Sequence, residues 1–376
     1  MSDTPLIWLA AGGTGGHLFP AEALGATLMK RGLRVRLVTD ARALRYSGLF
    51  SKEMVDVVPS ETVRSRNPLA LTRTAAMLGT GVARSLVLLR GLRPAVVVGF
   101  GGYPTLPPLF AAGLMKIPTV IHESNAVLGR ANRFLARRVS AIATALPGVL
   151  ERDAALKSKA SVTGTPMRPA ILAAAAVTFS APQPLAPLRL LVVGGSQGAR
   201  IMADVVPPAI ERLAPELWQR LVLVQQVREE DMGRVRAVYD RLKINAELAP
   251  FFADLPARLA ATHLVVSRSG AGTVAELAAV GRPSILVPLP GSIDQDQFAN
   301  AGVLADAGGA IRIPQAEFTP ERLAAEITGL AAEPPRLAAM VAAARGVGRL
   351  DAADQLADLV LKVAAIEAPA PTESCP

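Results

Sequence analysis

The sequence predicts an α/β protein of two domains, each built on a parallel sheet covered by helices. An apolar run at residues 6–11 leads into the glycine-rich stretch 12–16 and then into a helix, and a related strand–glycine–helix unit recurs at 191–199. Strand and helix candidates alternate in both halves with the spacing of βα units, which is typical of parallel sheets. Because ligands bind beyond the carboxyl ends of such strands, we expect the two glycine loops to face one central cleft.

The order of elements predicts the domain boundaries. In the first half we expect strands at Leu6–Ala11, Val35–Thr39, Ala95–Gly99, Thr119–His122 and Ala141–Thr144, and helices from near Pro20 and Pro68. In the second half we expect strands at Arg189–Val193, Leu221–Gln225, Leu264–Ser267 and Ser284–Val287, and a helix at Ala271–Val280. We predict a first domain at 1–168, an Ala/Pro-rich linker at 169–188 and a second domain at 189–349. A helix at about 350–366 is expected to pack back on the first domain, before a disordered tail at 367–376.

Composition excludes several classes of protein. Hydrophobic residues make up 51% of the 376 residues and charged residues 19%, which argues against global disorder. The single cysteine, Cys375, excludes an internal disulfide and a cysteine-based zinc site. The first residues lack the basic region of a signal peptide, so we expect a cytoplasmic protein. The best uncharged window, 94–115, is broken by prolines and glycines, so we expect no transmembrane helix.

Charge is unevenly distributed. Residues 1–168 hold 22 Lys and Arg against 9 Asp and Glu, a net +13, whereas the rest holds 18 against 22, a net −4. We expect Arg66, Arg73 and Arg84 to share one helix face, with apolar neighbours such as Leu78 and Val82. Basic and apolar residues without acids favour an interface with anionic lipid, although a core-packed helix with a solvated face gives the same pattern. Nucleic acid is disfavoured because aromatics are only 4% of the chain.

The first glycine loop predicts a ligand site. Gly12, Gly13, Gly15 and Gly16 allow close approach of the backbone, and the helix that follows favours an anion or a hydroxylated group. Leu18 stands where a dinucleotide fingerprint has its third glycine, so a nicotinamide site stays open only as an alternative, with Asp40 as its ribose-binding acid. The helix dipole should lower the pKa of His17 and leave a neutral imidazole to act as a base.

Two loops of the second half predict a nucleotide site. The Ser/Gly turn Arg268–Ala271 opens a helix and suits a diphosphate, and so does Ser196 in the second glycine loop. Glu276 lies one to two turns into that helix, where a carboxylate accepts from vicinal ribose hydroxyls. The stretch 294–297 is dense in carboxylates and amides, which suits a sugar. It contains Asp-x-Asp, but we infer no metal there because helix N-termini already supply positive charge. In the first half, Tyr103, Glu123 and Asn125 follow strands and should share one rim with His17.

Together these residues resemble the MurG family, the peptidoglycan glycosyltransferases that add N-acetylglucosamine to lipid I. The resemblance covers nearly the whole chain and rests on six motifs in order. They are Gly12–His17 with Phe19-Pro20, Gly101-Gly102-Tyr103, His122–Asn125 with Gly129 and Asn132, Gly194–Ala199, Arg268–Ala271 with Glu276-Leu277, and Asp294–Gln297 with Asn300-Ala301. The chain departs from the family at Ser124 and Asp296, and at Gln225–Arg228 it lacks the usual His-Gln-Ser/Thr-Gly.

The resemblance implies a GT-B fold, with UDP-GlcNAc held by the second Rossmann-like domain and the lipid acceptor by the first. His17 is the first candidate for the general base and Glu123 the second. The implied donor-binding residues are Thr14, Gly15, Gly16, Asn125, Arg168, Ser196, Phe252 near uracil, Arg268, Ser269, Gly270, Ala271, Glu276 and Gln297. The implied acceptor-binding residues are Gly13, Thr14, His17, Tyr103 and Asn132. No metal ligand or bound cofactor is implied, and a divalent cation at most stimulates.

The expected reaction is transfer of GlcNAc from UDP-GlcNAc to the C4 hydroxyl of MurNAc in undecaprenyl-diphosphate-MurNAc-pentapeptide, giving lipid II with inversion. The expected location is the cytoplasmic face of the bacterial inner membrane, as a peripheral protein on anionic lipids. Other proteins of cell-wall synthesis and division are expected partners, and nucleic acid is not. Two alternatives stay open: a UDP-GlcNAc 2-epimerase, which shares the two-domain design, and an NAD-dependent oxidoreductase.

Overall fold

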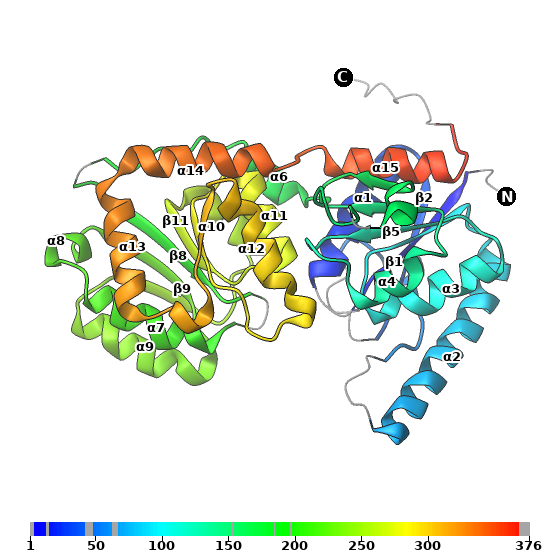
Figure 1. Cartoon of the computed structure of the whole chain (residues 1–376), viewed down its shortest axis with the longest axis horizontal. Coiled ribbons are helices and arrows are strands. Elements are labelled where there is room, and N and C mark those ends of the chain that lie inside the picture. The colour runs from blue at the N-terminus through cyan, green and yellow to red at the C-terminus, as the bar shows by residue number, and fades with distance from the viewer. Residues whose placement is uncertain are drawn as a thin grey trace. The chain divides into compact units, whose positions relative to one another are not determined.

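The structure is a computed structural model that describes residues 4–12, 15–41, 48–61, 67–151, 153–183, 185–195 and 198–367. The chain divides into two compact units (Figure 1). The first unit contains the residues up to Arg168 and those from Leu350 on, and the second contains Pro169–Arg349. The chain therefore passes between the units at two points.

The first unit is a parallel sheet of seven described strands in the order β3-β2-β1-β4-β5-β6-β7. The strands are β1 (Leu6–Ala10), β2 (Arg34–Thr39), β3 (Val55–Val57), β4 (Val96–Gly99), β5 (Thr119–Glu123), β6 (Ala141–Thr144) and β7 (Ala160–Val162). Its helices are α1 (Gly15–Lys30), α2 (Pro68–Leu92), α3 (Leu106–Leu114), α4 (Arg130–Ala136), α5 (Ala154–Lys157) and α15 (Ala352–Val363). Central strands are buried on both faces, which explains their continuous apolar runs.

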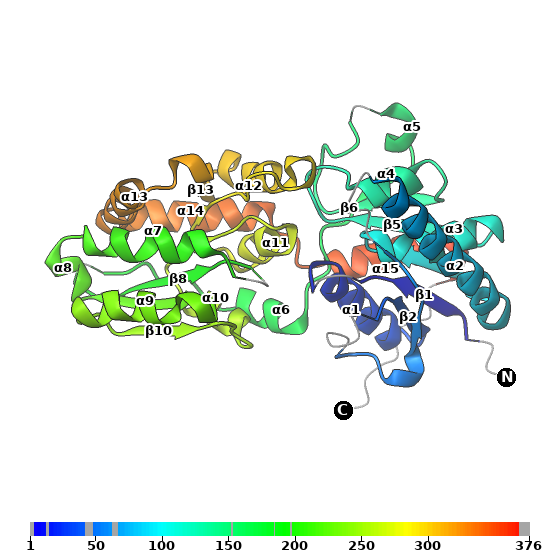
Figure 2. The same cartoon turned by 90° about the horizontal axis from the view of Figure 1, so that it is seen from below.

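Two apolar cores cover the two faces of this sheet. On one face, Leu9 and Val98 pack against Leu24 of α1 and Val360 of α15, and Arg31 of α1 pairs with Asp354 of α15 at 2.7 Å. The final helix thus completes the first unit although it is the last described element of the chain. On the other face, the strands pack against α2, α3 and α4 (Figure 2).

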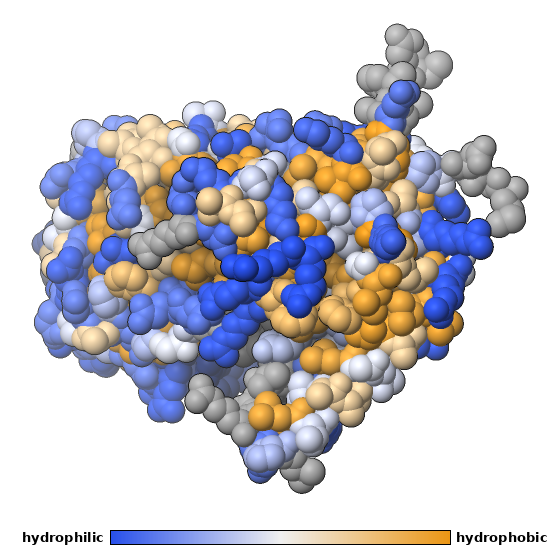
Figure 3. Space-filling view, turned by 45° about the vertical axis from the view of Figure 1, so that its right-hand side comes forward, coloured by the Kyte–Doolittle hydropathy of each residue, from blue (hydrophilic) through white to orange (hydrophobic). Residues whose placement is uncertain are grey.

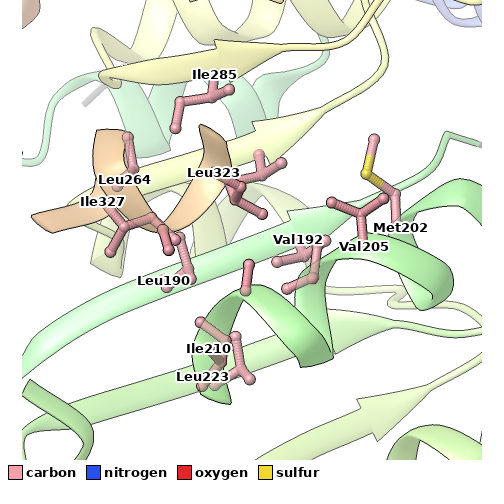
Figure 4. Close-up of a cluster of buried hydrophobic side chains, with 14 of the residues drawn as sticks. Leu190, Val192, Met202, Val205, Ile210, Leu223, Leu264, Ile285, Leu323 and Ile327 are labelled. Carbon is pink, nitrogen blue, oxygen red and sulfur yellow. The ribbon is translucent and has the colours of Figure 1, made fainter. Parts of the chain in front are cut away.

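The second unit has a parallel sheet of six described strands in the order β10-β9-β8-β11-β12-β13. They are β8 (Leu188–Val193), β9 (Leu221–Gln226), β10 (Ala246–Ala249), β11 (Leu264–Ser267), β12 (Ser284–Leu286) and β13 (Ala310–Arg312). Its helices are α6 (Pro169–Ala175), α7 (Arg200–Glu211), α8 (Pro215–Trp218), α9 (Glu229–Arg241), α10 (Leu255–Ala261), α11 (Ala271–Val280), α12 (Asp296–Asp306), α13 (Pro320–Ala332) and α14 (Pro334–Val347). Figure 4 shows Leu190, Val192, Leu223 and Leu264 of the sheet packed against α7 and α13.

The structure corrects three expectations. Helix α1 begins at Gly15, not near Pro20, and Pro20 lies inside the helix. The expected linker 169–188 begins with α6, which packs on α10 and α11 and belongs to the second unit. The short outer strands β3, β7, β10 and β13 were missed, because three or four residues carry too little periodic signal. In contrast, β6, β11 and α11 begin and end as the sequence predicted, and α2 begins at Pro68 as expected.

Candidate functional site

The candidate site of the first unit is built around His17 in the first turn of α1. The loop after β4 closes over its imidazole, with φ of 86° at Gly101 and 76° at Gly102. A Cβ at either glycine would lie 3.3 Å from a ring atom of His17. These two positions therefore need glycine for both conformation and space.

His17 is held as a neutral imidazole. Burial lowers its pKa, while the charge of Glu123 and a hydrogen bond with the backbone of Phe100 act in the opposite direction. Burial, rather than the helix dipole invoked from the sequence, is the leading cause. The Nδ1 atom is enclosed and has no partner among the residues that the structure describes. A neutral imidazole with an unused ring nitrogen has the properties of a general base.

Glu123, at the end of β5, is buried and accepts four hydrogen bonds from neighbouring groups. Its Oε1 accepts from Asn125 N at 3.0 Å and from Asn125 Nδ2 at 2.9 Å. Its Oε2 accepts from Gly129 N and Asn132 Nδ2, both at 2.9 Å. Asn132 also donates to the carbonyl of His122 at 3.1 Å. The carboxylate thereby holds the loop 124–129 and the start of α4 against the end of β5.

His122 is fully buried behind this loop. Its Nε2 lies 2.8 Å from the carbonyl oxygen of Gly164 and its Nδ1 3.3 Å from Ser124 Oγ. Because a carbonyl only accepts, Nε2 carries the proton and Nδ1 accepts from the serine hydroxyl. Burial lowers the pKa of His122, while its hydrogen bond to Gly164 and the charge of Glu123 act in the opposite direction.

Three more expected residues lie at this end of the first sheet or on the start of α1. Tyr103 follows β4 in a short 3₁₀ turn, Tyr103–Thr105, and is partly exposed. The guanidinium of Arg168 lies 4.0 Å from the ring centroid of Phe19. A Cβ at Gly15 would lie 2.9 Å from that same ring, so Gly15 lets Phe19 fold back under the start of α1.

In the second unit, the loop after β8 folds tightly on itself. A Cβ at Gly194 would lie 2.2 Å from the backbone nitrogen of Ala199. Gly195 and Gly198 have φ of 91° and 68°, which other residues rarely adopt. The loop leads into α7, whose first backbone N–H groups lack helical partners. Such a loop receives an anion well.

The turn between β11 and α11 lies next to it in the sheet order. Gly270 precedes the first residue of α11, Ala271, and Glu276 lies on the sixth position of that helix. The Arg268 guanidinium points into the protein: it donates to Val287 O and Pro288 O at 3.1 Å and to Gln315 Oε1 at 2.6 Å, and burial lowers its pKa. Arg268 therefore supports the turn from inside, and the backbone N–H groups at the start of α11 are the groups that suit an anion.

The segment before α12 is tied to this turn. Ser269 Oγ donates to the carbonyl of Gln297 at 2.8 Å, and Leu289 N donates to Gln297 Oε1 at 3.0 Å. Asp294 and Gln295 both have φ of 54°, a left-handed conformation that costs about 1–2 kcal/mol per residue. Asp296 Oδ1 accepts from Gln297 N at 2.7 Å. This strained turn fixes where the amide of Gln297 and the carboxylate of Asp296 lie.

Two adjacent phenylalanines follow β10 and differ in exposure. Phe252 is buried beneath the guanidinium of Arg258, 4.3 Å from its ring centroid. Arg258 is held in turn by Glu247 and Asp254 at 2.7 Å. Phe251 is 66% exposed and presents its ring to solvent.

Comparison with known proteins identifies the family. Residues 7–144 match the glycosyltransferase family 28 N-terminal domain and residues 189–356 match its C-terminal domain. The chain belongs to glycosyltransferase family 28. It is 76% identical, over 98% of both chains, to the UDP-N-acetylglucosamine–N-acetylmuramyl-(pentapeptide) pyrophosphoryl-undecaprenol N-acetylglucosamine transferase of Rhodopseudomonas palustris strain BisA53. The protein of the same name from Nitrobacter hamburgensis is 74% identical, over 98% of this chain and 100% of that one.

Solved structures agree with the fold of this family 28 chain. The crystal structure of Acinetobacter baumannii MurG has a TM-score of 0.76 and 28% identity, over 95% of this chain and 99% of that one. The UDP-GlcNAc 2-epimerase of Neisseria meningitidis bound to UDP-GlcNAc has a TM-score of 0.67 at 13% identity, over 95% and 100%. The second likeness shows the fold alone. The expected MurG resemblance and two-domain α/β fold are confirmed.

The structure brings together most of the residues singled out from the sequence. His17, Glu123, Asn125 and Asn132 form one cluster in the first unit. In the second unit, Ser269, Gln297 and Asn300 form another, since Asn300 Nδ2 donates to Ser269 O at 3.3 Å. Four expected residues lie outside the described part of the chain: Gly13, Thr14, Ser196 and Arg66.

Sequence reasoning missed three contributors to these sites. Gln226 holds two loops of the second unit together, and only its position at a strand end hinted at this. Phe251 is exposed, which no local pattern distinguished from its buried neighbour Phe252. Phe19 was noted in the motif, but its stacking with Arg168 joins residues that are far apart in sequence.

The expected membrane face of α2 is partly corrected. Val82 packs on the core, and Leu78 is also partly buried. The reason is that α2 packs on α3, and the buried face of α2 carries residues 74, 81, 85 and 89. The packing there is tight, since a Cβ at Gly81 would lie 2.3 Å from the carbonyl oxygen of Pro59 and 2.9 Å from the side chain of Pro107. The exposed large apolar residues of α2 are Leu71, Met77 and Val87, and Arg73 and Arg84 are exposed as expected.

Proposed function

We propose that this family 28 enzyme transfers N-acetylglucosamine from UDP-GlcNAc to the C4 hydroxyl of MurNAc in undecaprenyl-diphosphate-MurNAc-pentapeptide, forming lipid II. The observation that carries this is the 76% identity, over 98% of the chain, to a transferase whose name states this donor group and this acceptor. The reaction inverts the anomeric carbon: the C4 oxygen forms the new bond, UDP leaves with the bonding electrons, and a base takes the hydroxyl proton.

His17 is the base in this proposal. It is neutral near pH 7 because burial lowers its pKa, and its Nδ1 has no partner in the described chain. Glu123 is a poorer base because four donors already occupy its carboxylate. Glu123 instead positions Asn125 and Asn132, and Tyr103 and Asn132 contact the acceptor.

The second unit binds the donor. The backbone N–H groups at the start of α11, from Gly270 and Ala271 on, receive the diphosphate and stabilise the charge that develops on departing UDP. Glu276 accepts from the ribose hydroxyls, and Gln297, whose position is fixed by its bond from Leu289 N, contacts the sugar. The exposed ring of Phe251 stacks on uracil, whereas Phe252 is buried beneath Arg258. No bound cofactor takes part, and a divalent cation at most stimulates, which an assay with a chelator tests.

The decisive experiment compares His17→Ala with the wild-type enzyme. Turnover should fall about 100-fold or more, as for loss of a general base, while UDP affinity should stay within about threefold. Near-normal turnover would remove His17 as the base. Conversion of UDP-GlcNAc to UDP-ManNAc without an acceptor would instead favour the epimerase, the second candidate suggested by its shared fold.

We also propose that the first unit lies on the cytoplasmic face of the inner membrane. On α2, Arg73, Met77, Arg84 and Val87 recur at three- to seven-residue steps along one exposed face. On α3 and α4, Leu114 and Phe134 are exposed, and Arg138 lies 4.8 Å from the Phe134 ring centroid. Figure 3 shows apolar residues gathered beside hydrophilic ones on one face of the molecule. Basic and apolar residues together suit an anionic lipid surface.

One helix in the described part of the chain, Ala70–Leu92 of α2, is long and apolar enough to cross a membrane by length and composition alone. A single such helix is weak support for a span. Its packing on α3 favours peripheral binding. Vesicle flotation tests this: Arg73→Glu/Arg84→Glu should release the protein from anionic vesicles at low salt, and the exposed control Arg236→Glu in the second unit should not. Equal flotation of both would contradict the proposed surface. Proteins of cell-wall synthesis and division are proposed partners at this membrane.

A further inference from the structure

We infer that Gln226 is a positioning residue that holds the loops after β8 and β10 at a fixed separation. It thereby sets the distance between the part of the site that binds the diphosphate of the donor and the part that binds its uracil. The inference rests on the proposed function, since it concerns the same donor site. It adds a residue for which the sequence predicted no role.

The side-chain amide of Gln226 bridges two loops that are over 50 residues apart in the sequence. Its Oε1 accepts from Gly194 N at 2.9 Å, and its Nε2 donates to Gly195 O at 3.0 Å. The same Nε2 donates to Pro250 O, also at 3.0 Å. Gln226 is 6% exposed, so these bonds are shielded from water.

These contacts use both donors and the acceptor of a primary amide against three backbone groups. One oxygen accepts once and one nitrogen gives both of its protons. A carboxylate of the same length would place oxygen against two carbonyls, and a thioether would leave three backbone groups without a partner. Asparagine keeps the amide but is one methylene shorter. Glutamine is therefore the side chain that fits this position.

The other end of the glycine loop is held from the same strand end. Arg228, two residues after Gln226, donates from Nη2 to Gly198 O at 3.3 Å. Its stem lies against Gly198, where a Cβ would be 3.1 Å from Arg228 Cγ. The β8 loop is thus fixed at both of its ends by residues at the end of β9 and just after it. Only Gln226 also reaches the β10 loop, through Pro250, next to the exposed Phe251.

The two loops serve opposite ends of one nucleotide. The β8 loop leads into the start of α7 and suits the diphosphate, and the β10 loop carries the aromatic ring proposed for uracil. A ligand that spans both loops gains affinity when their separation is already set, because no ordering occurs on binding. A ligand that touches only one loop gains much less. Gln226 should therefore matter more for UDP than for uridine.

The test measures binding of UDP and of uridine by calorimetry, with uridine titrated in competition. For Gln226→Met we expect UDP affinity to fall about 10- to 100-fold and uridine affinity to change less than about threefold. Gln226→Asn should give the same pattern with a smaller loss, and it decides the question if the Met variant does not fold.

The matched control is Gln225→Met, on the opposite face of the same strand. Gln225 is fully buried, donates to Met202 O of α7 at 3.3 Å and accepts from Tyr239 of α9, and these side-chain bonds go to neither loop. The Gln225→Met variant should have a lower melting temperature than the wild type and an unchanged affinity for UDP. Unchanged UDP affinity in both Gln226 variants, or an equal loss for UDP and uridine, would overturn the inference alone. Failure of the wild-type protein to bind UDP would overturn the proposed function as well.

Discussion

Replacing Glu123 by glutamine separates a positioning role from a chemical one. The change keeps the shape of the side chain but turns one carboxylate oxygen into an NH₂ group. That group must face either Asn125 N and Nδ2 or Gly129 N and Asn132 Nδ2, which are all donors. Either orientation loses two hydrogen bonds to a charged acceptor and sets donors against donors.

The expected magnitude follows from these contacts. A hydrogen bond to a charged group contributes about 1.5–3 kcal/mol, so losing two costs about 3–6 kcal/mol at a side chain that is 3% exposed. This is a large part of the stability of a typical domain, about 5–15 kcal/mol. The loop 124–129 should loosen and Asn132 should lose its anchor, so turnover should fall as well.

The assay must report on the first unit alone, because a two-unit chain need not unfold in one step. The chain has two tryptophans, Trp8 in the first unit and Trp218 in the second. In a Trp218→Phe background, urea unfolding followed by fluorescence reports on Trp8, which is fully buried. The isosteric control Glu53→Gln, at an exposed carboxylate of the same unit, should leave the unfolding midpoint unchanged.

One result would refute the positioning role. If Glu123→Gln unfolded at the wild-type urea concentration but lost turnover together with the acid limb of the pH–rate profile, Glu123 would be the base. Loss of stability with the acid limb retained would support His17 as the base.

Three further predictions follow from buried contacts. Burial lowers the pKa of His122, so this histidine takes up a proton at a higher pH in the unfolded state than in the folded state. The stabilisation is therefore present above about pH 6.5 and is lost below it, by at most about 1.4 kcal/mol per pH unit. The urea midpoint of His122→Gln should depend less on pH than that of the wild type between about pH 7.5 and 5. Asp56→Ala should lower the free energy of unfolding by about 3 kcal/mol and shift the fluorescence of Trp8, because Asp56 accepts from Trp8 Nε1 at 2.9 Å and pairs with Arg36 at 2.7 Å. An unchanged urea midpoint would show that these contacts contribute little to stability. Gly194→Ala should abolish UDP binding in calorimetry, because its Cβ would lie 2.2 Å from Ala199 N. Retained binding would mean that the loop opens readily. The control is Gly233→Ala, which has open space at the position of its Cβ.

Local sequence alone determined the central strands, the start of α2 and the boundaries of α11 almost to the residue. Those segments have long apolar runs or strong periodicity, and both signals are local. It also determined which residues gather at the strand ends, because parallel topology sends every loop that follows a strand to the same edge. His17, Glu123 and Asn125 were predicted in this way, and the structure brings them into one cluster.

Tertiary structure alone decided which atoms those residues use. No local pattern indicated that four donors would saturate Glu123, that the Arg268 guanidinium would point inward, or that Phe251 would be exposed and Phe252 buried. Tertiary packing also placed Val82 against the core, because the partner that covers an amphipathic helix decides which of its faces is buried. Gln226 shows the same limit: its three partners come from loops far apart in the chain, and hydrogen bonds between distant segments exist only once the sheet has formed.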